Sequence, residues 1–298
     1  MNLSDEQPVW IPPRDGNERP RNESRVIVGA GIGRHYRERL RSTVNHCEVY
    51  CSDAWKLWFE TLPEGCPPHK ESQYAFKIFA IQRCIEAGFR YILWMDSSFA
   101  PVASIEPLWK LIEDFGWFVP QQGDAKLGTW TSDQALGLYG MARDQAMSIP
   151  LVYSGLVGLD IKSDYGSLIW PKWKALHQAG AFNGPHYNAL PPLTEWLKGG
   201  SWEPMGAKWK GRCSDDPRCE GHRHDESALA FVLDQLGLTP SVSGLLTLED
   251  SKGIIGHMVP DYDVVELRDA VLQYAQALRR AGDSPDIQEA EELGEICK

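Results

Sequence analysis

The chain lacks any long apolar run. No stretch of its 298 residues approaches the roughly 18 consecutive apolar residues that a membrane-spanning helix needs. The first 24 residues are polar and contain no apolar core of the kind found in signal peptides. These two absences predict a soluble, cytoplasmic protein with no membrane span.

Excess positive charge is also missing. The formal net charge is -11, with 30 Lys and Arg against 41 Asp and Glu. Because clustered basic side chains supply non-specific affinity for nucleic acid, this balance disfavours a nucleic-acid backbone as the main partner. Seven cysteines, an odd number, favour reduced thiols over a disulfide framework.

No internal repeat divides the chain, and its length and 43% hydrophobic content suit one large α/β domain. Residues 1–24 are rich in Pro, Asn, Glu and Arg without periodicity, which predicts a disordered or extended arm. The catalytic domain is expected over residues 25–260. A C-terminal helix within 263–281 and an acidic tail complete the chain, over residues 261–298.

Hydrophobic periodicity predicts alternating strands and helices. Tyr74, Ile78, Ile81 and Ile85 recur at intervals of 4, 3 and 4, so they share one helical face that ends at Gly88. Strands are expected over 26–29, 48–51, 91–95, 117–119 and 156–161, and further helices over 36–44, 104–115 and 226–236. This order predicts a parallel, doubly wound sheet that is buried on both faces. The long segment 179–222 shows little periodicity, which is more typical of a functional loop than of an idle one.

The most informative position is Asp96. The apolar strand Tyr91 to Met95 runs directly into Asp96, Ser97 and Ser98. Side chains at the carboxyl end of a central parallel strand emerge where open α/β sheets bind ligands. A carboxylate there can hold a divalent cation against a diphosphate, although Asp and Ser also make ordinary turns after strands.

Four segments together resemble one family. The run Lys77 to Ser98 (KIFAIQRCIEAGFRYILWMDSS) is similar to the helix, strand and Asp-x-Asp segment of GT-A glycosyltransferases, which act on nucleotide-sugar donors. Residues 153–160 (YSGLVGLD) resemble a later strand of that family, residues 222–227 (HRHDES) its acidic turn, and residues 254–257 (IIGH) its late strand with a metal-binding His.

The resemblance implies a GT-A-like α/β fold, with a mixed, mostly parallel sheet flanked by helices. It also implies transfer of a hexosyl or pentosyl group from a nucleotide sugar, foremost a UDP-sugar. The acceptor would be a hydroxyl of a glycan, lipid-linked sugar, protein or modified nucleic acid. Asp225 and Glu226 would be catalytic, and Trp130, Trp202 and His224 would contact the acceptor. Donor binding would involve Gly29, Ala30, Gly31, Arg34, Asp53, Lys77, Asp96, Ser98, Ser154 and Gly155.

The metal site departs from the family pattern. The resemblance assigns Mn2+ or Mg2+ to Asp96, Ser98 and His257, but the third position of the acidic triplet is Ser98 instead of a carboxylate. A hydroxyl is a poorer ligand than a carboxylate, so metal binding is expected to be weak and to depend on the donor. A non-catalytic sugar- or nucleotide-binding protein of the same fold is the alternative that Ser98 raises.

Three local alternatives stay open at this point. The run VIVGAGIG at 26–33 followed by Asp53 resembles the start of a dinucleotide-binding fingerprint, so a flavin or nicotinamide oxidoreductase is possible, although Arg34 occupies the place of the third glycine. Asp225 precedes a helix and is either its N-cap, a catalytic base, or both. A structural zinc could be held by four residues, Cys213, Cys219, His222 and His224, but their spacing matches no common zinc motif.

Overall fold

The computed structural model describes residues 8–13, 24–69, 71–186, 188, 212–240, 246–247 and 255–257. Outside these residues lie the whole segment 189–211 with Trp202, the C-terminal helix expected within 263–281, and the acidic tail. Within the arm that was predicted as disordered or extended, Val9–Ile11 forms a short strand, β1.

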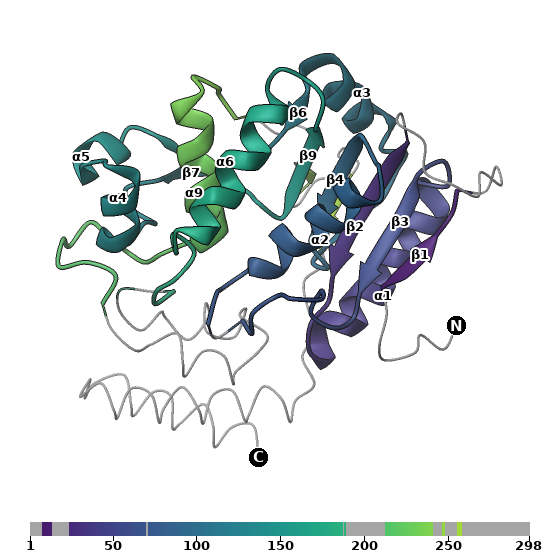
Figure 1. The fold of residues 1–298 in the computed structure, drawn as a ribbon, viewed down its shortest axis with the longest axis horizontal. Helices are drawn as coiled ribbons and strands as arrows, with labels where there is room; N and C mark the ends of the chain where they lie inside the picture. The colour runs from purple at the N-terminus through teal and green to yellow at the C-terminus, as the bar shows by residue number, and fades with distance from the viewer. Residues whose placement is uncertain are drawn as a thin grey trace.

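A mixed sheet forms the centre of the protein. Among the described residues it has six strands in the order β1-β3-β2-β4-β9-β6 (Figure 1). β3, β2 and β4 run parallel to one another, whereas β1 pairs antiparallel with β3, and β9 lies antiparallel between β4 and β6. The bounds are β2 Arg25–Ala30, β3 Trp55–Phe59, β4 Tyr91–Met95, β6 Trp117–Phe118 and β9 Leu156–Asp160.

Helices cover both faces of this sheet (Figure 1). Alternate residues of each strand point to opposite faces, so Val26 and Val28 join one buried cluster while Ile27 joins the other. The first cluster includes side chains of α2, α6 and α9, and the second includes side chains of α1 and α3. The bounds are α1 Arg34–Tyr50, α2 Ala75–Glu86, α3 Glu106–Phe115, α6 Gly166–Gln178 and α9 His224–Gln235.

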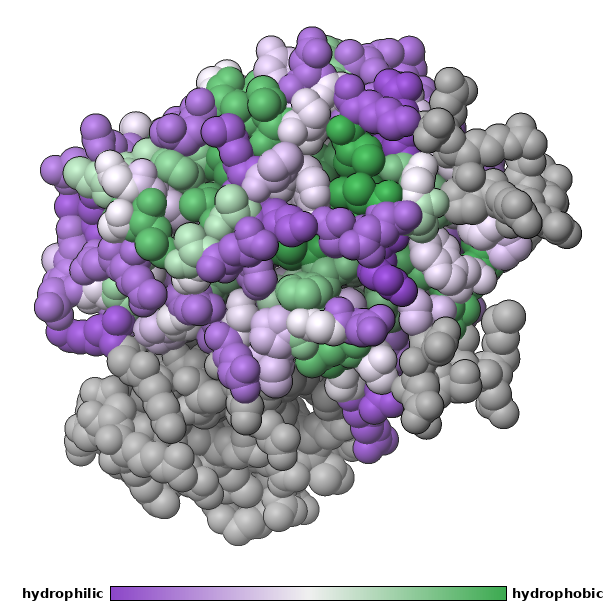
Figure 2. All heavy atoms as spheres, viewed as in Figure 1, coloured by the Kyte–Doolittle hydropathy of each residue, from purple (hydrophilic) through white to green (hydrophobic). Residues whose placement is uncertain are grey.

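Smaller elements lie at the margins of the central sheet. β5 pairs antiparallel with β11, which in turn pairs parallel with β10, and β7 pairs antiparallel with β8. The remaining bounds are β5 Phe99–Pro101, β7 Gln121–Lys126, α4 Asp133–Tyr139, α5 Arg143–Ala146, β8 Pro150–Val152, β10 Leu246–Thr247 and β11 Ile255–His257. None of the helices in the described residues is long and apolar enough to span a membrane, and the face in Figure 2 mixes hydrophilic and hydrophobic side chains.

The strand predicted over 48–51 is wrong. α1 continues to Tyr50, because Leu40, Val44, Cys47 and Cys51 recur at intervals of 4, 3 and 4 and pack as one stripe against the sheet. The second strand of the sheet is instead β3, in which every residue is buried. A short apolar run can belong to a helix or to a strand, and here the helical stripe prevailed.

Most other predicted elements are confirmed, but β9 runs antiparallel to β4, so the sheet is mixed, as the resemblance implied, and not wholly parallel, as the order of elements predicted. α2 is followed by Gly88 with a φ of 91°, and α9 is followed by Gly237 with a φ of 66°, the left-handed backbone that favours glycine after a helix. α9 begins at His224, two residues earlier than predicted. Asp225 therefore lies in the first turn, and the residue at the N-cap is Arg223.

Candidate active site

The carboxyl ends of the three parallel strands define one edge of the sheet. The glycine loop, residues 31–33, follows β2. Glu60 follows β3 and Asp96 follows β4. Because β9 runs antiparallel and pairs Leu156 with Met95, the residues that precede β9 reach the same edge. The structure thus brings Asp96 together with Ser154 and Gly155, which the sequence separates by almost 60 positions.

Asp96 is held firmly at this edge. Its backbone N–H donates to the carbonyl of Gly155 at 2.8 Å, and the indole N–H of Trp94 donates to its Oδ1 at 2.7 Å. A Cβ on Gly155 would lie 2.5 Å from the ring of Phe99 and 3.1 Å from Oδ2 of Asp96. Gly155 therefore leaves the space that the carboxylate occupies, and 28% of the Asp96 side chain remains exposed.

Lys77 lies behind Asp96 in a buried polar network. Its Nζ is 2.8 Å from Oδ2 of Asp225 and 3.3 Å from both carboxylate oxygens of Asp96. It also donates to the carbonyl and the hydroxyl of Ser154, at 3.1 and 3.0 Å. Burial favours the neutral amine, but Asp225 and then Asp96 outweigh it, so the pKa of Lys77 is raised. Lys77, predicted to face the donor, instead directs its ammonium at these carboxylates.

Asp225 is buried with Lys77, since each side chain is only 2% exposed. Its Oδ2 also accepts a hydrogen bond from the Ser154 hydroxyl at 2.6 Å, and its backbone carbonyl accepts one from the indole of Trp173 at 3.1 Å. The alternative of an N-cap is wrong, because the helix starts before this residue. The carboxylate is a partner of Lys77, and its burial separates it from an acceptor hydroxyl in solvent.

Glu226, the next residue of α9, has a different environment. Its side chain is only partly buried. Burial raises the pKa of Glu226 to about 8, Arg223 acts in the opposite direction, and the negative charge of Asp225 adds to the rise. A carboxyl group with a pKa near neutrality can exchange a proton with a substrate at physiological pH.

An aromatic and cationic pair borders Glu226. The guanidinium of Arg223 stacks over the ring of Trp130 at 4.3 Å. The backbone carbonyl of Trp130 accepts hydrogen bonds from the N–H of Arg223 at 3.0 Å and the hydroxyl of Ser227 at 2.5 Å. Trp130, a predicted acceptor contact, thus lies beside the start of α9.

His224, another predicted acceptor contact, is fully buried. Arg223 can only donate, so His186 accepts at Nε2 (2.8 Å) and must carry its proton on Nδ1. That proton goes to Nε2 of His224 at 3.1 Å, and Nδ1 of His224 donates to the carbonyl of Phe182 at 2.8 Å. Both ring nitrogens of His224 therefore bond to groups in the interior, and its contact with an acceptor stays a prediction.

The end of β2 and the glycine loop that follows it are packed tightly. A Cβ on Gly29 would lie 2.5 Å from the carbonyl of Met95, and one on Gly31 would overlap the carbonyl of Tyr36. Ala30 ends β2, and the Arg34 side chain, 81% exposed, pairs with Glu38 at 3.6 Å. These residues lie at the carboxyl edge, so their predicted role in donor binding stays a prediction.

Asp53 lies at the opposite edge of the sheet. It precedes β3 and pairs with Arg25, the first residue of β2, at 3.3 Å. The expectation that Asp53 follows the second strand is wrong, because that strand is β3, which begins after it. Its contact with the nucleotide stays a prediction, without the placement that motivated it. The acidic residue that does follow the second parallel strand is Glu60, whose side chain is 13% exposed and pairs with Arg41 at 3.4 Å.

The three predicted metal ligands offer few donor atoms. Asp96 supplies one carboxylate that already holds Trp94 and Lys77, and Ser98 supplies a partly exposed hydroxyl. The backbone of His257 pairs with Phe99, which brings β11 beside the turn after Asp96. Among the described residues, no group of three or more His, Cys, Asp or Glu is placed to hold a metal ion. The described side chains of Asp96 and Ser98 do not by themselves make a self-sufficient metal site, and the side chain of His257 lies outside the described part of the structure.

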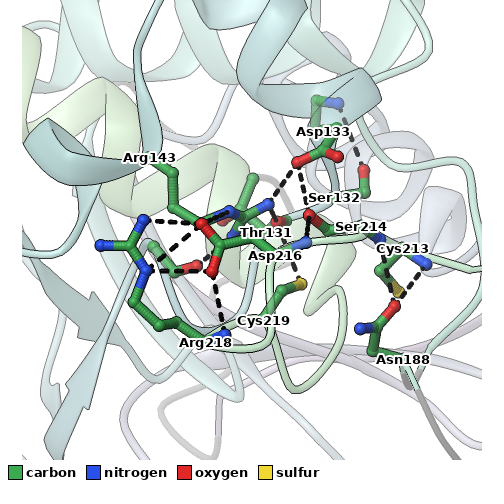
Figure 3. A network of polar contacts seen from close by, with 12 residues as sticks. Thr131, Ser132, Asp133, Arg143, Asn188, Cys213, Ser214, Asp216, Arg218 and Cys219 are labelled. Atoms are coloured by element: carbon green, nitrogen blue, oxygen red, sulfur yellow. Dashed lines mark hydrogen bonds and ion pairs between the residues drawn. The ribbon is translucent and has the colours of Figure 1, made fainter.

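The zinc alternative finds no support in the described part of the chain. His222 accepts from the N–H of Ser132 and donates to the carbonyl of Ala181, at 3.5 and 2.9 Å, so both nitrogens are used. The thiols of Cys213 and Cys219 donate to backbone carbonyls, at 3.1 Å for the first and 3.4 and 3.6 Å for the second. Figure 3 shows these cysteines in a network that Arg143, Asp133 and Asp216 hold together.

Several residues of the site escaped sequence analysis. Trp94 and Trp173 donate to Asp96 and Asp225, but from the sequence both are ordinary core aromatics. Thr43 contacts the turn after Asp96 from α1, and nothing in its own segment signals this contact. Arg223 lies in the HRHDES segment that carries part of the resemblance. Its position three residues before Glu226 is the signal that could have identified it.

Comparison with known proteins gives a structural likeness only. No protein-family model matches the chain, and no curated protein matches its sequence. Mouse xyloside xylosyltransferase 1 covers 80% of this chain and 100% of its own at a TM-score of 0.43 and 9% identity. The galactosyltransferase LgtC covers 84% and 95% at 0.34 and 11%, and the bifunctional glycosyltransferase WbbM covers 91% and 51% at 0.33 and 9%. These neighbours are glycosyltransferases, and at such scores the functional argument rests on the chain's own residues.

Proposed function

We propose that this chain is a glycosyltransferase that moves a hexosyl or pentosyl group from a nucleotide-diphosphate sugar, foremost a UDP-sugar, to an acceptor hydroxyl. One observation carries the proposal. At the carboxyl edge of the sheet, Trp94 and Lys77 fix a partly exposed Asp96 directly after Met95, whose carbonyl packs against Gly29, and the charge of Asp96 contributes to the raised pKa of Glu226. This is the position at which open α/β sheets bind nucleotides.

The residues divide into a donor side and an acceptor side. On the donor side, Gly29 and Gly31 leave no room for side chains at the end of β2, where a diphosphate would approach the backbone, although the N–H of Gly31 itself donates to the carbonyl of Phe59 at 2.9 Å. Lys77 orients Asp96 from behind. Glu226 is the better of the two proposed catalytic carboxyls, because it is partly exposed and its pKa is about 8. It would accept the proton of the acceptor hydroxyl as the new bond to the sugar forms. Asp225 would support it indirectly by fixing Lys77.

A divalent cation belongs to this proposal only together with the donor. The described residues supply one carboxylate and one hydroxyl, so most ligands of Mn2+ or Mg2+ would have to come from the diphosphate and water. Titration of Mn2+ into the protein with and without UDP tests this expectation. Binding that appears only with UDP supports it, and equal affinity without UDP contradicts it.

The donor can be identified by thermal denaturation with UDP, UDP-sugars, NAD and FAD. A ligand at about 100 times its dissociation constant adds roughly 2.7 kcal/mol to the free energy of unfolding, which shifts the melting temperature measurably. We expect nucleoside diphosphates to stabilise the protein and the dinucleotides not to do so. Stabilisation by NAD or FAD alone would overturn the proposal.

Turnover requires a separate experiment. Glu226→Gln should lower the release of UDP from the donor on the order of 100-fold and leave UDP binding unchanged, because the amide cannot accept the proton. Glu220→Gln is the matched control, since Glu220 is an exposed carboxylate a few residues before α9. Equal turnover in both variants would remove Glu226 from the mechanism.

The two remaining alternatives separate clearly. A non-catalytic binder would be stabilised by UDP-sugars and yet release no UDP with any acceptor or with water. A dinucleotide oxidoreductase is disfavoured by the antiparallel β9 next to β4, because the dinucleotide-binding fold continues there with parallel strands.

A further inference from the structure

The turn that follows Asp96 is tied to α1 by one buried hydroxyl. Thr43 is fully buried in the middle of α1. Its Oγ1 lies 2.7 Å from the carbonyl of Phe99 and 3.3 Å from that of Ser97. These two carbonyls flank Ser98, so a single side chain reaches across to both sides of the residue that replaces a carboxylate in the family pattern.

The other contacts of this turn show what the hydroxyl adds. The N–H of Asp96 donates to Gly155, and the N–H of Phe99 donates back to the carbonyl of Asp96 at 2.9 Å. These bonds fix the turn on the side of β9. Beyond the turn, β5 pairs with β11, in which His257 lies opposite Phe99. The Thr43 hydroxyl joins the turn itself to α1. One turn later in α1, Nδ1 of His46 donates to the carbonyl of Pro101 at 3.0 Å, beyond the turn.

Packing alone does not call for threonine at this position. Its neighbours on the buried stripe of α1 include Leu40 and Cys47, and a valine would fill the same volume. A threonine hydroxyl in a helix usually bonds the carbonyl four residues earlier, and Oγ1 does lie 3.2 Å from the carbonyl of Arg39. A hydroxyl has one proton, and the shortest of the three distances is to Phe99. The hydroxyl proton of Thr43 is therefore best placed to donate to the carbonyl of Phe99 in the turn.

We propose that Thr43 is a positioning residue for the donor site, which holds the turn from Asp96 to Phe99 in the geometry that binds the nucleotide diphosphate. The inference rests on the proposed function. Thr43 itself contacts no substrate. Its effect passes through the backbone of Ser97 and Phe99 to the side chains of Asp96 and Ser98.

The test compares three variants. Thr43→Val removes the hydroxyl and keeps the shape, and Thr43→Ser keeps the hydroxyl. Thr131→Val is the control, because Thr131 is equally buried and its Oγ1 donates to the carbonyl of Leu127 at 2.6 Å, within the network of Figure 3. Each valine variant loses one buried hydrogen bond of the same kind, so the two should lose similar stability.

UDP affinity and amide hydrogen exchange are measured on the full chain. We expect Thr43→Val to bind UDP roughly fivefold to tenfold more weakly and to exchange the amides of residues 96–99 faster without ligand. Thr43→Ser should stay within about twofold of the wild type, and so should Thr131→Val. Unchanged affinity in Thr43→Val, or an equal loss in Thr131→Val, overturns the inference. If the wild type binds no nucleoside diphosphate at all, the proposed function fails first, and the positioning of the donor site fails with it.

Discussion

Removal of Lys77 is expected to destabilise the protein more than removal of either carboxylate that it holds. Lys77 and Asp225 are 2.8 Å apart and each is 2% exposed, so neither charge has solvent to replace its partner. Breaking a buried pair from one side costs about 3–5 kcal/mol. Lys77→Met leaves both Asp225 and Asp96 without their cation, which places its cost at about 4 kcal/mol.

Asp225→Asn should cost less, about 2 kcal/mol, because Lys77 keeps Asp96 at 3.3 Å and both oxygens of Ser154. The double variant leaves no buried ammonium and no buried Asp225 carboxylate. We therefore expect its cost to fall below the sum of the two single costs by at least about 1 kcal/mol. A larger cost for Lys77→Met than for Asp225→Asn, together with a double-variant cost below their sum, would show that Lys77 is the cation that both Asp225 and Asp96 share.

Urea unfolding followed by tryptophan fluorescence measures these differences, and unchanged m-values confirm that the same surface unfolds. Lys110→Met is the control, since Lys110 pairs with Asp114 at 3.1 Å on the surface, with 72% of its side chain exposed. That pair is worth at most about 0.5 kcal/mol. Costs that add within about 0.5 kcal/mol, or a Lys77→Met variant as stable as Lys110→Met, would refute the account of the buried network.

Three further predictions concern pH and the glycine loop. The folded pKa of Glu226 is raised from 4.5 to about 8, so its contribution to stability is present below pH 4.5 and is lost as the pH rises through 8. Glu226→Gln should therefore gain stability relative to the wild type across this range, and parallel melting curves from pH 4 to 9 would contradict the raised pKa. Burial lowers the pKa of His222 to about 4, so its contribution is present above pH 6.5 and is lost as the pH falls towards 4. His222→Gln should flatten acid unfolding in that window, and an unchanged acid midpoint would show that another group controls it. Gly31→Ala should cost about 1–3 kcal/mol in urea unfolding, because its Cβ would overlap the carbonyl of Tyr36, whereas Gly137→Ala in the open interior of α4 should gain up to about 1 kcal/mol. Similar effects of the two alanines would argue against close packing of the loop.

Local patterns were sufficient wherever one segment decides its own structure. The helical spacing from Tyr74 to Ile85 and the apolar run from Tyr91 to Met95 predicted α2 and β4, and both are confirmed. Gly88 and Gly237 marked helix ends because only the left-handed backbone closes those turns. The position of Asp96 followed from the direction of β4 alone.

The same reasoning failed where the helical and the strand periodicity both fit the same residues. Residues 48–51 fit a short strand, and only the buried stripe that begins at Leu40 shows that they continue a helix. That error moved Asp53 to the wrong edge of the sheet and hid Glu60. Asp225 was misplaced by a smaller error of the same type, since helix boundaries depend on backbone geometry that capping preferences only approximate.

The sequence by itself determined an α/β chain with a carboxylate at the end of a central strand, because hydrophobic period and turn residues are local properties. Only the tertiary structure decided what surrounds that carboxylate. The antiparallel entry of β9 brings Ser154 and Gly155 to Asp96, and α9 brings Asp225 to Lys77. These residues come from segments far apart in the chain, and their spacing in sequence contains no measure of distance. Whether a carboxylate is buried against an ammonium or left to meet a substrate depends on that packing.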